Sequence, residues 1–259
     1  MAVLEVRNLA KRFGGLTAVE DLDFEVKHGE ILGLIGPNGA GKTTVFNLIT
    51  GFHRPTRGGI VFLGDNITGA KPHEIARLGL IRTFQLVNLI LKQTAYENMR
   101  FAYHLQRRAG VFASIFRTKT ARRDEKAIHE NTLKLLKGMG LYDVMDQQSG
   151  SLPHGLRKVL GVGVALAAGP KLLLLDEPTA GLSPAEAETL IGQIRGIRDG
   201  GIDIMVVEHN MKVIMNICDR IIVLNFGHKI AEGTPKEDSE NSDVISAYLG
   251  FRRNDDQSA

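Results

Sequence analysis

The chain has 259 residues, of which 43% are hydrophobic, so it is long enough to bury a core as one large domain or two small ones. The formal net charge of +3 and the sequence pI of about 9.0 give only a weak indication of nucleic acid or anionic lipid as a partner. A single cysteine, Cys218, excludes an internal disulfide and suits a reducing compartment.

No segment of the sequence approaches the roughly 20 apolar residues that are needed to cross a bilayer. The best candidate, residues 159–169, is too short and contains three glycines. The opening residues, MAVLEVRNLAKRF, lack the uninterrupted apolar stretch of a signal peptide. We therefore expect a cytosolic protein that works at a membrane only through a partner.

The first third of the chain has the pattern of strands joined by tight turns. Residues 4–9 (LEVRNL) and 22–30 (LDFEVKHGE) alternate apolar and polar side chains, which is the period of a half-buried antiparallel strand. Residues 58–67 (GGIVFLGDNI) repeat this alternation. We expect an N-terminal antiparallel β-subdomain.

The middle of the chain has a helical pattern. From about Glu97 to Leu136 long polar and charged stretches predominate, and Gly138 or Gly140 is expected to end the last helix. We expect a helical subdomain here.

After Lys171 strands and helices alternate, which is typical of an α/β fold. SPAE, at residues 183–186, offers a serine N-cap, a proline at the first helical position and a glutamate three residues after the cap. This pattern predicts a helix that runs to the stop at residues 199–201.

Three apolar runs are predicted to be central parallel strands that are buried on both faces. They begin at Ile31 (ILGLIG), Leu172 (LLLLDE) and Ile204 (IMVVEH), and each runs directly into polar residues. Because ligands of open parallel sheets bind beyond the carboxyl ends of the strands, these three endings predict one site.

The first ending is GPNGAGKTT, which fits the pattern G-x-x-x-x-G-K-[ST] between a strand and a helix. Glycines let backbone N–H groups surround phosphate oxygens, Lys42 reaches the β- and γ-phosphates, and the Thr43 hydroxyl ligates Mg²⁺. A plain glycine-rich turn would not need the lysine and the threonine. The expected ATP-binding residues of this loop are Gly36, Pro37, Asn38, Gly39, Ala40, Gly41, Lys42, Thr43 and Thr44.

The other two endings carry titratable side chains. Asp176 can hold Mg²⁺ directly or through water, and Glu177 can orient the water that attacks the γ-phosphorus. His209 can hydrogen-bond the γ-phosphate. Alone, the two acids could equally be solvated and the histidine structural, but their position beside a phosphate-binding loop favours function.

At this point the chain resembles the nucleotide-binding subunits of ABC transporters over about residues 3 to 250. The resemblance rests on the order of KRFGG, the phosphate-binding loop, RTFQ, LPHGL, LLLLDEP, AGLSP and EHN. It implies that Phe13 stacks on adenine, that Gln85 reaches the metal and the water while sensing a transmembrane partner, and that Glu177 is the general base. His209, Gln85 and Lys42 complete the implied catalytic set.

The resemblance also implies the architecture. The fold is expected to be α/β, a P-loop NTPase with a mostly parallel central sheet, an N-terminal antiparallel β-subdomain and a helical subdomain. The expected parts are a single domain over 1–250, with catalytic and β parts at about 1–85 and 165–250, a helical subdomain at about 86–164 and a polar tail at 251–259.

A narrower resemblance is to the ATPases of branched-chain amino acid importers, and especially to the longer of their two paired ATPase subunits. GFHRPTRGGIVFLGDNITG, IARLGLIRTFQ, EPTAGLSP and AEGTPKEDSENSDVISAYLG carry it, and residues 107–123 match the longer subunit's helical insert. Urea and short-chain amide importers use similar ATPases, so the solute rests on analogy.

The chain departs from the family at the signature sequence. Where the family has LSGGQ, or in this branch often LAYGQ, this chain has residues 152–156, LPHGL. Pro153 supplies neither a hydroxyl nor a backbone N–H, and Leu156 cannot hydrogen-bond through its side chain. Gly155 remains as the expected contact to the ATP held by the opposite subunit.

The resemblance implies a head-to-tail pair of ATPase subunits, as a hetero- or homodimer, with two ATP molecules between them. It also implies transmembrane permease subunits, a periplasmic or extracellular solute-binding protein that acts indirectly, and a peripheral location on the cytoplasmic face of the inner membrane. No nucleic acid is expected. Since the signature serves the other subunit's ATP, its weakness predicts that the site built on Lys42 and Glu177 hydrolyses normally while the other site is impaired.

Two other classes of function stay open at this stage. The first is an ABC-type ATPase that acts on nucleic acid or ribosomes, although the chain lacks the very long coiled-coil insert or the second cassette of such proteins. The second is a regulatory module that binds ATP with little turnover, an alternative that the poor signature leaves open.

Overall fold

The computed structural model describes residues 2–83, 89–105 and 119–255 of the chain. The chain divides into two compact units. Unit 1 comprises Met1–Arg82, Lys171–Thr179 and Ile194–Ala259, and unit 2 comprises Thr83–Pro170 and Ala180–Gln193.

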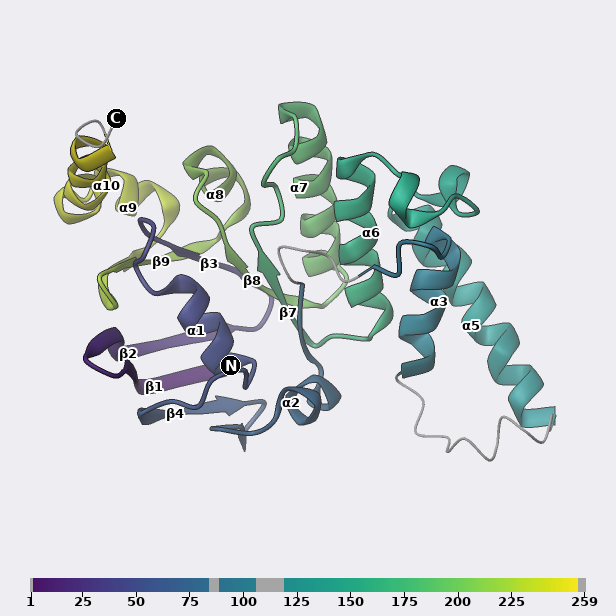
Figure 1. Cartoon of the computed structure of the whole chain (residues 1–259), viewed down its shortest axis with the longest axis horizontal. Coiled ribbons are helices and arrows are strands. Elements are labelled where there is room, and N and C mark those ends of the chain that lie inside the picture. The colour runs from purple at the N-terminus through teal and green to yellow at the C-terminus, as the bar shows by residue number, and fades with distance from the viewer. Residues whose placement is uncertain (1, 84–88, 106–118, 256–259) are drawn as a thin grey trace. The chain divides into compact units, whose positions relative to one another are not determined.

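Unit 1 contains an antiparallel sheet with the strand order β2-β1-β4-β5 (Figure 1). Its strands are β1 (Ala2–Phe13), β2 (Leu16–Lys27), β4 (Arg57–Phe62) and β5 (Asp65–Asn66). The alternation along β2 puts Leu22 and Val26 in the core, each 0% exposed, because successive side chains of a strand point to opposite faces. The expected antiparallel β-subdomain is confirmed.

Unit 1 also contains a six-stranded sheet with the order β10-β9-β3-β8-β7-β6, in which β10 alone is antiparallel to its neighbour. Its strands are β3 (Ile31–Ile35), β6 (Leu80–Arg82), β7 (Leu172–Asp176), β8 (Asp203–Val207), β9 (Arg220–Asn225) and β10 (His228–Gly233). The three apolar runs are the adjacent strands β3, β8 and β7, and every residue in them is buried. Their prediction as central parallel strands is confirmed.

Helix α1 (Lys42–Ile49) lies between the two sheets of unit 1 in the view of Figure 1. Its side chains Val45, Phe46 and Ile49 are 0% exposed and belong to one apolar cluster with residues of both sheets. The remaining helices of this part of the chain are α2 (Pro72–Leu78), α8 (Met211–Ile217), α9 (Pro235–Glu240) and α10 (Ser242–Asp255). Packing of α1 against both sheets fixes the loop that precedes it.

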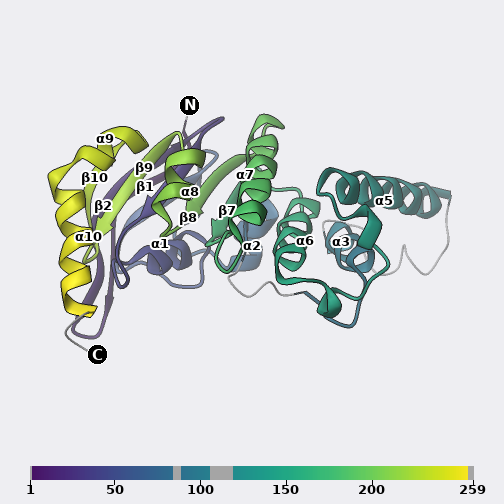
Figure 2. The same ribbon diagram turned by 90° about the horizontal axis from the view of Figure 1, so that it is seen from above.

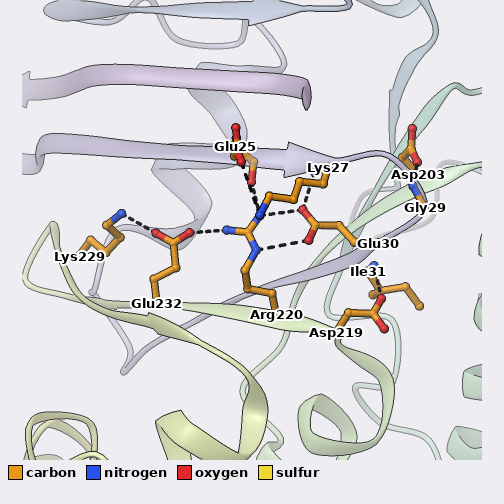
Figure 3. Close-up of polar contacts among 10 residues, drawn as sticks. All are labelled: Glu25, Lys27, Gly29, Glu30, Ile31, Asp203, Asp219, Arg220, Lys229 and Glu232. Carbon is orange, nitrogen blue, oxygen red and sulfur yellow. Dashed lines mark hydrogen bonds and ion pairs between the residues drawn. The ribbon is translucent and has the colours of Figure 1, made fainter. Parts of the chain in front are cut away.

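An ion-pair network joins the two sheets at the amino-terminal end of β3 and β9 (Figure 3). Arg220 donates from Nη2 to Glu30 Oε1 at 2.7 Å and to the Glu25 carbonyl oxygen of β2 at 2.6 Å, and it also pairs with Glu232. Burial lowers the pKa of Arg220, but Glu30 and Glu232 outweigh burial and raise it overall. The Arg220 guanidinium is therefore held in its charged form although its side chain is mostly buried.

Unit 2 contains the helices α3 (Ala95–Leu105), α5 (Lys119–Gly138) and α6 (His154–Ala167), with short 3₁₀ turns at Tyr142–Val144 and Ser149–Ser151. Helix α3 packs against both α5 and α6 (Figures 1 and 2). Helix α5 ends at Gly138, as predicted. The insert at 107–123 lies mostly outside the described residues.

The predicted helix after SPAE is confirmed as α7 (Pro184–Asp199). Ser183 and Glu186 form the expected reciprocal cap: the Ser183 N–H donates to Glu186 Oε2 at 2.9 Å, and the Glu186 N–H donates to Ser183 Oγ at 3.4 Å. None of the helices that the structure describes combines the length and the apolar character of a membrane span.

Candidate active site

The loop that follows β3 is shaped by glycines with positive φ. Gly36 has φ 152° and Gly41 has φ 106°. A Cβ atom on Gly36 would collide with the Leu224 carbonyl oxygen, and one on Gly41 would collide with the Ala18 carbonyl oxygen. The loop can take this path only with glycine at both positions, so the spacing of glycines in the sequence reflects a backbone requirement.

The loop leads straight into α1, whose N-cap residue is Gly41 and whose first turn has no side-chain cap. Backbone N–H groups of a first helical turn have no intrahelical partner, and the helix dipole makes this end positive. A phosphate group satisfies both requirements. The loop and the start of α1 therefore have the geometry of an anion-binding site.

Lys42 is the first residue of α1, and it is buried against the loop. Its Nζ donates to the carbonyl oxygens of Gly36 at 2.6 Å and Pro37 at 2.9 Å. Burial lowers the pKa of Lys42, and the carboxylates of Glu177 and Asp176 oppose part of that change. The lysine and the two acids, predicted from separate motifs, thus interact electrostatically at one end of the sheet.

The carboxyl ends of β7 and β8 bring Glu177 and His209 together. Asp176 pairs with Val207 in the parallel ladder, and the Glu177 N–H donates to the Val207 carbonyl oxygen at 2.9 Å. Glu177 has φ 48°, a left-handed conformation that is costly for a non-glycine residue and is frequent at functional sites. His209 Nδ1 lies 3.7 Å from Glu177 Oε1.

Glu208 is a buried acid beside this pair that the sequence interpretation did not single out. It is 0% exposed and accepts hydrogen bonds from the Thr179 N–H at 2.9 Å and the Thr179 hydroxyl at 2.6 Å. These bonds tie the segment after β7 to the segment after β8. The available signal was an acid at the end of an apolar strand, which is unusual unless the acid is paired.

Arg82 is a second residue that the sequence interpretation missed as part of the site. Its Nη2 donates to Asp176 Oδ2 at 2.6 Å, and its Nη1 donates to Asn47 Oδ1 on α1 at 2.6 Å. The Arg82 and Asp176 side chains are 6% and 4% exposed. The signal in the sequence was an arginine at the end of a short apolar strand, inside the quoted motif RTFQ.

Of the other residues predicted for the nucleotide site, the structure describes some and not others. Phe13 ends β1 and is 42% exposed, with its ring edge-on to His53 at a centroid distance of 5.2 Å. Gln85 lies outside the described residues. The Thr43 hydroxyl and the Asp176 carboxylate are hard oxygen donors, and this donor set fits Mg²⁺.

The signature region belongs to unit 2, where it starts a helix. Helix α6 begins at His154 after Pro153, so Gly155 lies within the first helical turn and does not form a separate turn before the helix. Pro153 is the N-cap residue of this helix, a position whose N–H takes no part in the helical hydrogen bonds, so its missing N–H costs nothing there. Gly155 is buried, and a Cβ there would collide with the Glu186 carboxylate.

A strand, a glycine loop and a lysine at the start of a helix, with acids at the end of another strand of the same sheet, define a P-loop nucleotide-binding protein. Comparison with known proteins identifies the family within this class. The family described as "ABC transporter" matches residues 19–180. The chain belongs to the ABC transporter family and is one of its ATPase cassettes.

Individual relatives agree with this assignment. The chain is 41% identical over 249 residues to the high-affinity branched-chain amino acid transport ATP-binding protein BraF of Pseudomonas aeruginosa, covering 96% of this chain and 98% of the relative. The same identity and coverage hold for the high-affinity branched-chain amino acid transport ATP-binding protein LivG of Escherichia coli. A crystal structure of the ADP conformation of an ATP-binding cassette of an ABC transporter matches with a TM-score of 0.84 and 30% identity, over 96% of this chain and 99% of that one.

Proposed function

We propose that this chain is the ATP-hydrolysing subunit of a membrane importer for branched-chain amino acids or a similar small solute. The observation that carries the proposal is the 41% identity over 96% of the chain to a relative described as a branched-chain amino acid transport ATP-binding protein. Residues 1–250 would then work as one nucleotide-binding domain, and 251–259 as its tail. Glu177 and His209, in contact at the sheet end, support hydrolysis as the activity.

Each site residue has a role in this proposal. Lys42 and the N–H groups of the loop hold the phosphates of ATP, and Phe13 stacks on the adenine. Thr43 and Asp176, with Gln85, hold Mg²⁺, which when bound neutralises charge on the phosphates.

Hydrolysis depends on the two residues beyond the strand ends. Glu177 orients the attacking water and accepts its proton, which is the role of a general base. His209, 3.7 Å from Glu177, hydrogen-bonds the γ-phosphate and fixes the direction in which the Glu177 carboxylate points.

The signature supports a second part of the proposal, an unequal pair of sites in a head-to-tail dimer. Pro153 and His154 are the exposed residues at the start of α6, whereas Gly155 is buried. Neither exposed residue supplies the hydroxyl of the usual serine. We therefore infer that the partner's ATP is the poorly hydrolysed one, while the ATP on this chain's Lys42 and Glu177 is hydrolysed normally.

A surface on unit 2 suits the transmembrane partner. Ile90 and Leu91 are 43% and 54% exposed. The buried Asn98 holds this segment, since it accepts from the Ile90 N–H at 2.9 Å and donates to the Ile90 carbonyl oxygen at 3.2 Å. These two apolar side chains, on a backbone that Asn98 holds in place, offer a contact for a permease. Binding there would place the chain on the cytoplasmic face of the inner membrane. A solute-binding protein would act from the other side of that membrane.

Co-purification tests the function against its alternatives. The tagged chain is expected to pull down permease subunits from detergent-solubilised membranes, and the assembled complex in liposomes is expected to hydrolyse ATP faster when a solute-binding protein and leucine are added. Enrichment of nucleic acid or ribosomes in place of permeases would contradict the proposal. An assembled complex that binds ATP without turnover would support a regulatory module.

Placing the glutamate-to-glutamine change in one subunit at a time tests the inequality of the two sites. Glu177→Gln is expected to abolish ATP turnover by the transporter, and the matching change in the partner subunit is expected to reduce it much less. Turnover that survives Glu177→Gln but not the partner's change would refute the assignment of the active site.

A further inference from the structure

Arg82 is in direct contact with the expected metal ligand Asp176. Arg82 is the last residue of β6, the edge strand that pairs with β7. In that ladder Arg82 lies beside Leu174, so its side chain extends two residues along β7 to reach Asp176 Oδ2 at 2.6 Å. The contact joins the carboxyl ends of the two strands, where the predicted chemistry takes place.

The same guanidinium also binds the helix that follows the phosphate loop. Its Nη1 donates to Asn47 Oδ1 at 2.6 Å, and its central carbon lies 5.4 Å from the centre of the Phe46 ring. Asn47 is four residues after Thr43 on α1, so the two side chains share one face of the helix. Arg82 thus links the elements that carry both oxygen donors expected to hold Mg²⁺, Thr43 on α1 and Asp176 on β7.

The burial of this ion pair requires an explanation. Removing a carboxylate and a guanidinium from water costs more than their attraction returns unless further hydrogen bonds satisfy them. A planar guanidinium with two partners fixed on separate elements holds a carboxylate in one orientation, which a flexible lysine does not do. The buried pair of Arg82 and Asp176 therefore serves to orient the Asp176 carboxylate more than to stabilise the fold.

We propose that Arg82 is a positioning residue for the metal site: it fixes the orientation of the Asp176 carboxylate relative to Thr43 before Mg²⁺ and ATP bind. This inference rests on the proposed roles of Thr43 and Asp176 in holding Mg²⁺. It makes the contribution of Mg²⁺ to ATP affinity depend on Arg82, whereas the affinity for metal-free ATP depends on the loop and Lys42.

Arg220 is a matched control within the same unit. It is also an arginine in a mostly buried ion pair, with side-chain exposures of 15% for Arg220 and 12% for Glu30, compared with 6% and 4% for Arg82 and Asp176. Arg220 is the first residue of β9, which runs parallel to β3, so it lies at the end of the sheet opposite the phosphate loop. A purely structural role for Arg82 predicts that both arginines behave alike when they are replaced.

The experiment measures the Kd of fluorescent mant-ATP for the full chain in Mg²⁺ and again in EDTA. The ratio of the Kd in EDTA to the Kd in Mg²⁺ measures how much Mg²⁺ strengthens ATP binding. Arg82→Gln is expected to reduce this ratio by about tenfold, the usual weight of one charge-assisted hydrogen bond, with the Kd in EDTA changed less than about twofold. Arg82→Lys is expected to restore part of the ratio, and Arg220→Gln is expected to leave it at the wild-type value.

Thermal unfolding of each variant shows which ones are folded. If Arg82→Gln does not fold, Arg82→Lys and Asn47→Ala decide, and each is expected to lower the ratio by about threefold because each weakens one of the two contacts. An unchanged ratio in the folded Arg82 and Asn47 variants overturns the inference, as does an equal fall in Arg220→Gln. A wild-type chain with no Mg²⁺ dependence would instead contradict the proposed metal site itself.

Discussion

Asp238 is a buried carboxyl group outside the nucleotide site, and its surroundings predict a measurable cost to stability at neutral pH. It lies on α9 and is 3% exposed, and its Oδ2 has no hydrogen-bond partner among the described residues. Burial, together with the carboxylates of Glu237 and Glu232, raises the pKa of Asp238 to about 6, although the Gly233 N–H partly opposes this change.

The direction of the pH effect follows from this pKa. The folded state holds the Asp238 proton more tightly than the unfolded state, whose aspartate has the ordinary value of 3.8. The proton therefore contributes stability below that value, and the contribution is lost as the pH rises to about 6. The difference of about two units between the folded and unfolded pKa corresponds to at most about 3 kcal/mol of unfolding free energy. Screening by solvent around the neighbouring charges reduces the expected loss of stability at pH 7 to about 1–2 kcal/mol.

Asp238→Asn removes this cost because an amide carries no charge and keeps an oxygen for the Gly233 N–H. Urea unfolding at pH 7.5 is expected to give a free energy of unfolding higher by about 1–2 kcal/mol in the variant, and the gain is expected to shrink toward zero near pH 4. Asp65→Asn, at an exposed aspartate, is the control and is expected to change stability by less than about 0.5 kcal/mol. A loss of stability at pH 7.5, or a gain that does not vary with pH, would refute this reasoning.

Two further substitutions test the site. Gly41→Ala puts a Cβ against a neighbouring carbonyl oxygen and is expected to weaken mant-ATP binding at least about tenfold, whereas Gly192→Ala, where no atom lies within 4 Å of the added carbon, is expected to leave binding intact. Thr179→Val removes the hydroxyl that donates to the buried Glu208 and is expected to cost about 1.5–3 kcal/mol in urea unfolding. Thr189→Val, at an exposed position on α7, is expected to cost less than about 0.5 kcal/mol, and equal losses in both threonine variants would contradict the assigned role of Glu208.

Much of the fold could be predicted because local patterns determine it. The alternation in β1 and β2, the three buried strands and the cap of α7 each reflect constraints that act over a few residues. Strands β6, β9 and β10 were not predicted. Strand β6 is three residues long, and β9 pairs with β3, whose proximity to it is a tertiary property. Strand β10 pairs with β9 across the short turn at Phe226 and Gly227, a local hairpin that the sequence interpretation overlooked.

The site could be predicted where a backbone requirement or a strand ending determines it. Gly36, Lys42 and Glu177 belong to contiguous motifs, and their chemistry follows from position in the chain. The ion pair of Arg82 with Asp176 joins residues 94 positions apart, and neither motif contains information about the other. Long-range polar contacts of this kind are determined by packing of the sheet and cannot be read from spacing.

Uptake of radiolabelled leucine by proteoliposomes is the most direct test of the central claim that this chain powers solute import by hydrolysing ATP. The vesicles contain the permease that co-purifies with the chain, its partner ATPase and the solute-binding protein. ATP is supplied on the side of the membrane where the chain is bound. Wild-type chain is expected to support ATP-dependent uptake, and Glu177→Gln is expected to reduce it by about a hundredfold or more, as for loss of a general base. Uptake that is the same with Glu177→Gln as with the wild-type chain would contradict the account.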